Sequence, residues 1–375
     1  MPLVKLSDLV TKPDHTYAVG AFNVSDMEMA MGAIRSAEEM NAPLILQVAE
    51  GRLRYSPLDL LGPVMIAAAK KCKMPTAVHL DHGGTMETIR LALELGFTSV
   101  MFDGSKYPLE ENIARTREVV KLAKGYGADV EAEIGRVGGA EGDYKSVDVL
   151  VTSVEEAKRF AEETSVDALA VAIGTAHGNY KEQPVLRIDR LKEIAAAVKT
   201  PLVLHGGTGL TDEDFKECIA SGIQKINIAT ASYDASANRI RKVAAENPTA
   251  RYFEFSEAIA EGTYENVKKH MAIFGMKDKA YGETTMALIT FDDSKKRDVV
   301  LIGRVTLDFN PNELNRTLDK VETFSMYLGG SPGNMAVGIN KLGKKVGFIG
   351  CVSNDQFGDF VLNYFNERNI DTSQM

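Results

Sequence analysis

The chain has 375 residues, 45% of them hydrophobic and 25% charged, which is typical of a folded protein with one large domain and additional sequence. Its 43 basic and 52 acidic residues give a net charge of −9 without long runs of one sign, which argues against nucleic acid or an anionic membrane as a partner. Cys72, Cys218 and Cys351 form no CxxC pair, and no segment has the apolar length of a membrane span. We therefore expect a reduced protein of the cytoplasm.

Short apolar runs alternate with amphipathic stretches along most of the chain. Helix starts can be recognised between the runs, because Ser25 to Glu28 and Ser153 to Glu156 fit a capping box and Thr211 to Asp214 fits a looser version of it. Eight runs have the composition of strands: 17–23, 43–49, 76–81, 98–103, 129–134, 167–174, 201–206 and 224–230. Eight strand–helix units predict a (β/α)8 TIM barrel of the α/β class, although a doubly wound open sheet has the same alternation.

Ionisable residues lie where several of these strands end. Asp81 and His82 end the third strand, His177 follows the sixth, and His205 ends the seventh. In a barrel the C-terminal ends of all strands meet at one mouth, which is where active sites of this fold lie. An open sheet would spread the same residues along an edge, so their pattern favours the barrel.

Three of the histidines are predicted to converge, and each is followed by glycine. A single histidine at a strand end is more often a structural group, but three together form the neutral imidazole set that binds Zn²⁺ with an open fourth position. They are His82, His177 and His205. The other three histidines are interpreted as structural or surface residues: His15, His79 and His270. For His79 a supporting role behind the metal is left open.

Glycine-bearing loops suggest a phosphate site and a lid. The segments HGGTG at 205–209 and NIATAS at 227–232 follow the last two strands, where barrels commonly bind phosphate, although each alone could be a tight turn. The polar segment 133–146 is long for a connection. It could be a lid carrying Glu141 as a catalytic group, or only a flexible loop.

A metal, a phosphate site and a carboxylate beside a metal ligand together suggest carbon–carbon bond cleavage in a phosphorylated keto-sugar. Zn²⁺ can polarise the ketone of such a substrate. Asp81 would then take the proton from the hydroxyl whose carbon becomes the aldehyde.

Residues 1–284 resemble the class II, zinc-dependent ketose-bisphosphate aldolases. Five segments carry the resemblance in the family's order: HLDHGG, EAEIGRVGGAEGDY, GTAHGNY, LVLHGGTG and KINIAT. The resemblance implies Asp81 as the catalytic acid and base and Glu141 as a mobile-loop catalytic residue. It implies five metal-binding positions, the last two as alternatives: His82, His177, His205, Asp103 and Glu133.

The same resemblance implies contacts to the dihydroxyacetone phosphate part of a substrate. These contacts come from three loops: Gly178, Gly206, Gly207, Thr208, Asn227, Ile228, Ala229 and Thr230. A monovalent cation, Na⁺ or K⁺, is expected near the phosphate, and the family implies a homodimer or homotetramer.

Beyond a linker at 285–297, residues 298–375 resemble the N-terminal part of a ribokinase-type (PfkB) sugar kinase. GRVTLDFN and GGSPGNMAVGINKLG carry this likeness, with Asp308 and Asn334 expected to contact sugar and Ser353 departing from the usual glycine. No later G-A-G-D segment follows, so we expect an incomplete α/β fragment without kinase activity. Its uncovered sheet edge and apolar surface predict partial disorder or aggregation.

The kinase-like segment is most similar to 5-dehydro-2-deoxygluconokinases, which suggests a substrate from inositol catabolism. That substrate would be 6-phospho-5-dehydro-2-deoxygluconate, cleaved to dihydroxyacetone phosphate and malonate semialdehyde. Its carboxylate would need an arginine such as Arg52 or Arg54, although each alone is better interpreted as a surface charge.

Four alternatives stay open. Fructose or tagatose 1,6-bisphosphate could be the substrate, giving glyceraldehyde 3-phosphate beside dihydroxyacetone phosphate. The chemistry could pass through a Schiff base on Lys225. The chain could be a bifunctional aldolase and kinase, or a non-catalytic, metal-dependent phosphosugar-binding protein.

Overall fold

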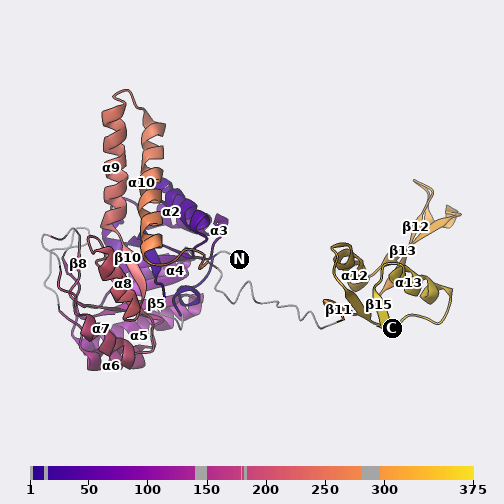
Figure 1. Ribbon diagram of the computed structural model, residues 1–375, viewed down its shortest axis with the longest axis horizontal. Helices are drawn as coiled ribbons and strands as arrows, with labels where there is room; N and C mark the ends of the chain where they lie inside the picture. The colour runs from indigo at the N-terminus through magenta and orange to yellow at the C-terminus, as the bar shows by residue number, and fades with distance from the viewer. Residues whose placement is uncertain (1–2, 12–15, 140–149, 179, 181–183, 281–295) are drawn as a thin grey trace. The chain divides into compact units, whose positions relative to one another are not determined.

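The computed structural model describes residues 3–11, 16–139, 150–178, 180, 184–280 and 296–375. The chain divides into two compact units, Met1–Met286 and Ala287–Met375. Each unit has a hydrophobic core of its own, and each is described separately (Figure 1).

Eight parallel strands close into a barrel in the first unit, which confirms the predicted (β/α)8 fold and excludes the open sheet. Around the barrel the order is β1, β10, β9, β7, β5, β4, β3, β2. Their bounds are β1 Val19–Asn23, β2 Leu44–Ala49, β3 Thr76–Gly83, β4 Ser99–Phe102, β5 Asp129–Ile134, β7 Ala168–Val171, β9 Leu202–Leu204 and β10 Ile223–Ile228. Two short strands pair outside the barrel: β6 Gly138–Gly139 and β8 Ala176–His177.

Helices surround the barrel: α1 Leu6–Val10, α2 Met27–Met40, η1 Glu50–Arg52, α3 Leu58–Lys71, α4 Met86–Glu94, α5 Leu109–Tyr126, α6 Val154–Thr164, α7 Ile188–Ala197, α8 Asp212–Ala220, α9 Thr230–Glu246 and α10 Tyr252–Ile273. The capping box predicted at Thr211 is present. The one predicted at Ser25 is wrong: Asp26 caps α2, and its carboxylate accepts a hydrogen bond from Met29 N at 2.7 Å. Asp26 directly precedes the helix, whereas the Ser25 hydroxyl contacts the Tyr233 hydroxyl instead.

The long helices α9 and α10 extend together beyond the barrel (Figure 1). Helix α10 packs against α2 at Gly32 and against α9 at Gly262. A Cβ atom at Gly32 would lie 2.3 Å from the Ala260 carbonyl oxygen, and one at Gly262 would lie 2.6 Å from the Ala235 carbonyl oxygen. Glycine at both positions therefore lets the helix backbones approach closely.

The barrel interior is unusually polar. Alternate residues of a strand share one face, and branched apolar side chains normally fill a barrel of this kind. Here strands β3, β5 and β10 instead contribute pairs of buried polar residues two positions apart: His79 and Asp81, Glu131 and Glu133, and Lys225 and Asn227. These side chains form the base on which the mouth of the barrel is built.

The second unit contains a parallel sheet, a hairpin and two helices. The sheet order is β11, β14, β15, and β12 pairs with β13 in the antiparallel hairpin. The bounds are β11 Val299–Ile302, β12 Thr306–Pro311, η2 Leu318–Lys320, β13 Phe324–Gly329, α12 Ser331–Lys341, β14 Val346–Ile349, α13 Gln356–Asn366 and β15 Asp371–Gln374. Residues 296–375 thus form helices and strands around a small core that includes Phe348 and Phe365, and the expected partial disorder or aggregation stays a prediction. Uncovered apolar surface is present as expected, because Ile302 and Leu318 are 74% and 75% exposed.

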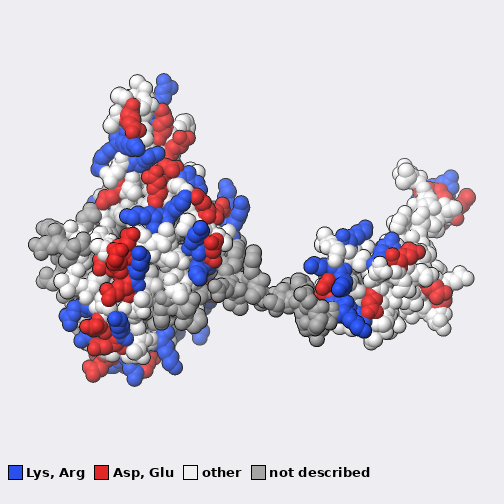
Figure 2. Space-filling model, viewed as in Figure 1, with Lys and Arg blue, Asp and Glu red and all other residues white. Residues whose placement is uncertain are grey.

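The surface of the first unit carries both signs of charge. Figure 2 shows Lys and Arg side chains interspersed with Asp and Glu over the visible face, without a broad basic patch. Among the helices that the structure describes, none combines the length and apolar character needed to cross a bilayer.

The close packing of α10 on α2 makes a stability prediction. Gly32→Ala is expected to lower the free energy of unfolding by about 1–3 kcal/mol, because the added methyl group overlaps a backbone carbonyl. The control is Gly125→Ala in the exposed part of α5, where nothing lies within 4 Å of the new Cβ and stability should rise by about 0.4–1 kcal/mol. Urea unfolding followed by circular dichroism measures both, and a Gly32→Ala variant as stable as wild type would contradict the packing account.

Candidate active site

Asp81 and His82 are neighbours in β3, yet both line one pocket. Neighbours in a regular strand point to opposite faces. The register of β3 against β4 shifts between Leu80 and Gly83, and His82 has a left-handed φ of 47°. This bulge turns both side chains toward the mouth of the barrel. Bulges and strained non-glycine residues of this kind are typical of functional sites.

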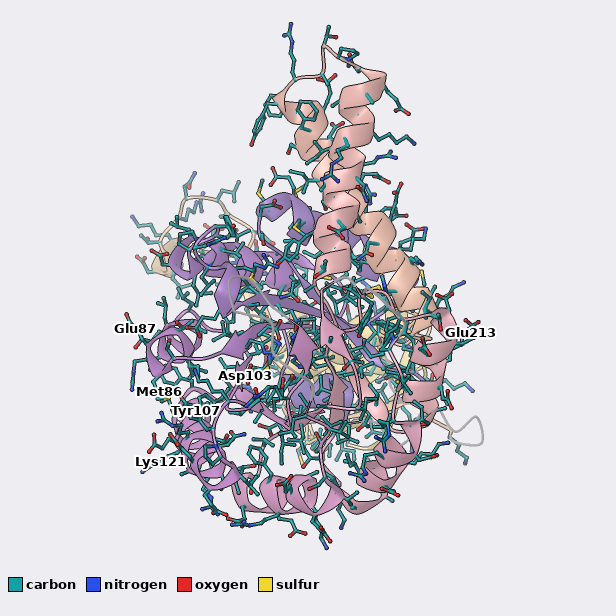
Figure 3. The ribbon with its side chains drawn as sticks, turned by 90° about the vertical axis from the view of Figure 1, so that its left-hand side faces the viewer. Met86, Glu87, Asp103, Tyr107, Lys121 and Glu213 are labelled. Carbon is teal, nitrogen blue, oxygen red and sulfur yellow. The ribbon has the colours of Figure 1, made fainter. Side chains whose placement is uncertain are left out.

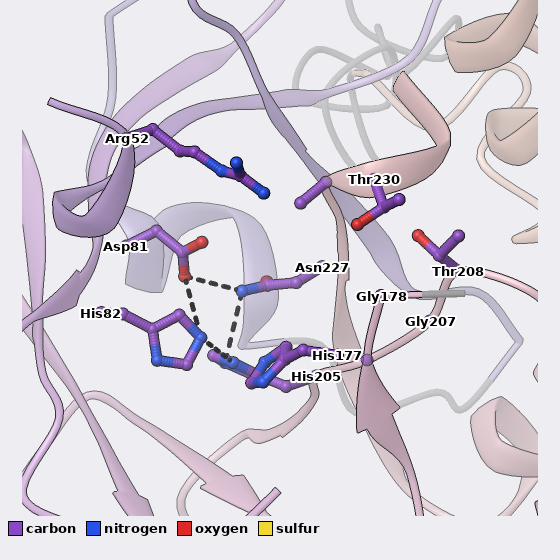
Figure 4. A pocket seen from close by; sticks show the side chains of 12 residues that line it. Arg52, Asp81, His82, His177, Gly178, His205, Gly207, Thr208, Asn227 and Thr230 are labelled. Atoms are coloured by element: carbon purple, nitrogen blue, oxygen red, sulfur yellow. Dashed lines mark hydrogen bonds and ion pairs between the residues drawn. The ribbon is translucent and has the colours of Figure 1, made fainter. Parts of the chain in front are cut away.

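The pocket lies at the mouth of the barrel (Figure 4). It contains most of the predicted site residues together with an arginine. The lining residues are Arg52, Asp81, His82, His177, Gly178, His205, Gly206, Gly207, Thr208, Asn227, Ala229 and Thr230. The loops after β3, β7, β9 and β10 therefore meet, as the strand-end pattern predicts.

The three histidines converge in this pocket. The ring centroid of His82 lies 4.8 Å from that of His177 and 4.7 Å from that of His205. One nitrogen from each ring lies within 4.8 Å of the others, which is close enough for a shared ion. This arrangement supplies three imidazole donors and leaves a further position open toward the pocket.

Carboxylate partners determine which ring nitrogens can bind a metal. His82 Nδ1 lies 2.8 Å from Asp103 Oδ2, and His205 Nε2 lies 2.9 Å from Glu131 Oε1. A carboxylate accepts a proton donor, so these nitrogens carry the protons. The remaining nitrogens, His82 Nε2 and His205 Nδ1, then direct lone pairs at each other across 2.9 Å. Carboxylate-bonded histidines are the usual support of a metal site, so the donor set fits Zn²⁺.

The Glu131 carboxylate is held by a second buried partner. Its Oε2 atom lies 2.8 Å from Lys225 Nζ, and both side chains are completely buried. Burial alone would raise the pKa of Glu131, but the Lys225 ammonium and the hydrogen bond from His205 outweigh burial and hold this pKa below its usual range. Burial lowers the pKa of His205 despite the attraction of Glu131, so the neutral ring is favoured as a ligand.

Asp81 is fixed by amide groups from three strands. Its Oδ2 atom accepts hydrogen bonds from Asn23 Nδ2 at 3.1 Å and Gln47 Nε2 at 3.3 Å. Its Oδ1 atom accepts one from Asn227 Nδ2 at 2.9 Å, and Asn227 Oδ1 in turn accepts from Lys225 Nζ at 2.6 Å. These donors stabilise the ionised carboxylate and leave it 3.9 Å from His82 Nε2.

Asp103 and Glu133 lie behind His82 and form a second candidate cluster with it. In Figure 3 Asp103 lies toward the barrel, whereas Glu87 and Lys121 lie at the periphery. Burial would raise the pKa of Asp103, but the hydrogen bonds from His82 and Ser105 hold it below its usual range. Burial and the neighbouring Asp103 charge raise the pKa of Glu133 to about 8.

The two predicted phosphate loops lie side by side. Gly206 has a left-handed φ of 69°, and a Cβ there would lie 2.5 Å from the Ala176 carbonyl oxygen. Thr208 Oγ1 accepts a hydrogen bond from Ala231 N in the first turn of α9 at 3.2 Å. The N-terminus of this 17-residue helix and the glycine amides therefore border the same space, an arrangement that favours an anion.

Some predicted residues lie elsewhere. Ile228 ends β10 with its side chain fully buried in the hydrophobic core, so only its backbone can face the loop. Glu141 lies outside the described residues. His270 packs against Phe215 and Phe274 in the core, and His79 is buried beside Ser99 beneath the site.

Two further outcomes concern charged residues that the sequence left ambiguous. Arg52 lines the pocket, whereas Arg54 is exposed and contacts Tyr55. Lys225, the candidate for a Schiff base, is absent from the pocket wall and is paired with Glu131. Gln47 was missed, although a glutamine inside the apolar run LILQVA is the kind of signal that marks a buried polar network.

Comparisons with known proteins agree with this geometry. The family model described as "Fructose-bisphosphate aldolase class-II" matches residues 5–279, and the one described as "pfkB family carbohydrate kinase" matches residues 296–375. A probable fructose-bisphosphate aldolase of Bacillus subtilis (strain 168) is 41% identical over 252 residues, which cover 66% of this chain and 88% of the relative. A fructose-bisphosphate aldolase of Staphylococcus aureus (strain Mu50) is 37% identical over 286 residues, covering 75% of this chain and 100% of the relative.

Solved structures give the same result. The YdjI aldolase from Escherichia coli K12 has a TM-score of 0.65 and 32% identity, covering 74% of this chain and 99% of its own. A putative fructose-1,6-bisphosphate aldolase from Coccidioides immitis has a TM-score of 0.66 and 30% identity, covering 71% of this chain and 94% of its own. The chain belongs to the class II fructose-bisphosphate aldolase family.

Proposed function

We propose that the barrel cleaves a phosphorylated ketose to dihydroxyacetone phosphate and an aldehyde, using Zn²⁺ held by His82, His177 and His205. The observation that carries this proposal is the pair of imidazole nitrogens, His82 Nε2 and His205 Nδ1, that face each other at 2.9 Å beside Asp81. Zn²⁺ bound there would supply a Lewis acid that polarises the substrate carbonyl.

Asp81 is the acid and base of the proposed reaction. Cleavage of the carbon–carbon bond requires removal of the proton from the hydroxyl whose carbon becomes the aldehyde, and the reverse reaction returns it. The amide donors Asn23, Gln47 and Asn227 hold Asp81 in place as the ionised base. Because Asp81 lies beside the metal-binding nitrogens, a ketose bound through its carbonyl would present this hydroxyl to the carboxylate.

The loops after β9 and β10 would bind the phosphate of the dihydroxyacetone phosphate half. Backbone amides of Gly206 and Gly207 and the N-terminus of α9 supply positive partial charge there. Tyr180 Oη donates to the Gly206 carbonyl oxygen at 2.6 Å and accepts from Ala176 N at 3.0 Å, which ties the segment after β7 to the loop after β9. The monovalent cation and the part played by Glu141 stay predictions.

Fructose 1,6-bisphosphate is the substrate that the relatives support best, because the curated relatives described above carry that enzyme's name. A second candidate, 6-phospho-5-dehydro-2-deoxygluconate, is favoured by one observation, the pfkB-type sugar kinase segment at residues 296–375. Both substrates would use the same metal, base and phosphate loops, and they differ only in the aldehyde half.

Metal removal and substrate choice test this proposal together. Dihydroxyacetone phosphate release should disappear after dialysis against a chelator and return with Zn²⁺, because Zn²⁺ is the Lewis acid of the proposed reaction. Three substrates are compared: fructose 1,6-bisphosphate, tagatose 1,6-bisphosphate and 6-phospho-5-dehydro-2-deoxygluconate. We expect the highest kcat/KM for fructose 1,6-bisphosphate. Activity that survives chelation but is lost with borohydride would instead support a Schiff base, and no turnover of any of the three would refute the proposed reaction.

Asp81→Asn tests the assignment of the base. The amide keeps the shape of the side chain but cannot accept the proton, so kcat should fall by about 10²- to 10⁴-fold while zinc content is retained. Asp59→Asn in the exposed first turn of α3 is the matched control and should leave kcat unchanged. An Asp81→Asn enzyme with wild-type kcat would show that another group moves the proton.

A further inference from the structure

His82 has a backbone conformation that residues other than glycine rarely adopt. Its φ of 47° lies in the left-handed region, and the register of β3 on β4 shifts between Leu80 and Gly83. A residue in such a conformation persists only where the surrounding structure holds it. The contacts on either side of this bulge therefore decide where the His82 imidazole points.

Strand β4 holds the bulge from one side. Asp103 N donates to the Gly83 carbonyl oxygen at 3.0 Å. A Cβ atom at Gly83 would lie only 2.4 Å from the Met101 carbonyl oxygen, so the two backbones are in close contact. These contacts fix the strand as far as Gly83, and the residues that follow need a second anchor.

The Glu50 side chain lies in the right place to be that anchor. In the register of β2 on β3, Ala49 pairs with Asp81. Glu50 follows Ala49 as the first residue of η1, so it leaves β2 at the level of His82. Its carboxylate can therefore contact the segment that follows the bulge.

The Glu50 carboxylate binds four hydrogen-bond donors of this segment. Its Oε2 atom accepts from Gly84 N at 2.6 Å and from Thr85 N at 3.3 Å. Its Oε1 atom accepts from Thr85 Oγ1 and from Thr88 Oγ1, both at 3.0 Å. Both carboxylate oxygens are thus used within the chain, and together they tie the end of β2 to the connection after β3.

Helix capping does not account for these hydrogen bonds. Helix α4 is capped by Thr85, whose hydroxyl accepts from Thr88 N at 3.2 Å. The amides of Gly84 and Thr85 precede the helix, so they belong to the connection between the bulge and α4. Glu50 is also absent from the described residues that line the pocket, so it does not face a substrate. Its hydrogen bonds therefore serve the position of the connection itself.

We propose that Glu50 is a positioning residue for the metal site, which holds the connection after β3 so that His82 points toward the other imidazoles. This inference rests on the proposed function, in which His82 is a zinc ligand. Its Nε2 atom faces His205 Nδ1 at 2.9 Å, and a small rotation of the bulge would change that separation. Glu50 acts through the backbone, whereas Asp103 acts on the His82 ring itself.

Two conservative substitutions separate position from charge. Glu50→Gln keeps the length of the side chain: its amide oxygen can accept from the two backbone amides, and its amide nitrogen can donate to the threonine hydroxyls. Glu50→Asp keeps the charge but is one methylene shorter and cannot reach all four donors. We expect Glu50→Asp to weaken zinc binding by about 10- to 100-fold and Glu50→Gln to weaken it by less than about threefold.

Zinc affinity of the purified full-length protein is measured without substrate, by competition with a chromophoric chelator. The temperature is one at which circular dichroism shows every variant to be folded. Asp129→Ala controls for a general loss of stability, because it removes a carboxylate that accepts from Ser7 N at 2.7 Å. Asp129 begins β5, at the end of the barrel away from the pocket, so its loss should leave zinc affinity unchanged.

Wild-type zinc affinity in Glu50→Asp would overturn the inference, because the anchor would then be unnecessary. Equal losses in the two variants, or a larger loss in Glu50→Gln, would assign the effect to charge and overturn it as well. Failure of the proposed reaction appears differently. Wild type would then bind zinc but release no dihydroxyacetone phosphate from any of the three substrates, while the dependence of zinc affinity on Glu50 would persist. Wild type without measurable zinc affinity would overturn both.

Discussion

The buried Glu131 carboxylate is the interaction on which the rest of the site depends. One of its oxygens forms an ion pair with the Lys225 ammonium and the other accepts a hydrogen bond from His205, inside a barrel where both side chains are completely buried. Removing one partner of such a buried pair typically costs about 3–5 kcal/mol, because the remaining charge is uncompensated. Glu131 also determines the protonated nitrogen of His205, and Lys225 orients Asn227, which bonds Asp81. One ion pair thus positions both a proposed metal ligand and the proposed base.

The polar interior of the barrel explains how several polar side chains can meet at its mouth. Asp103 does for His82 what Glu131 does for His205, so both rings turn a lone pair toward the same point. The bulge at His82 then allows Asp81 and His82, adjacent in sequence, to act in the same pocket. The glycine backbone of the loop after β9, the start of α9 and the Arg52 side chain line the same pocket. Each function comes from a different strand end, as the barrel geometry permits.

Much of this arrangement could be predicted from the sequence, and the limits have physical causes. Strand periodicity and strand-end residues predicted the barrel and the convergence of the three histidines. Glu131 and His205 are 74 residues apart, and their contact depends on the strand register, which no local pattern encodes. Arg52 and Arg54 have equivalent sequence contexts, but the η1 turn anchored by Glu50 leaves only Arg52 in the pocket wall. Packing within residues 296–375 was also unpredicted, because a fragment's small core depends on contacts such as Phe348 with Phe365.

The central claim is that Glu131 creates the metal site, and zinc affinity tests it most directly. The affinity of purified wild type and of Glu131→Gln for Zn²⁺ is measured by competition with a chromophoric chelator. Glutamine fills the same volume but removes the charge that orients His205, so zinc affinity should fall by about 10- to 100-fold in a variant whose circular dichroism matches wild type. Unchanged zinc affinity in that folded variant would contradict the claim that Glu131 creates the metal site.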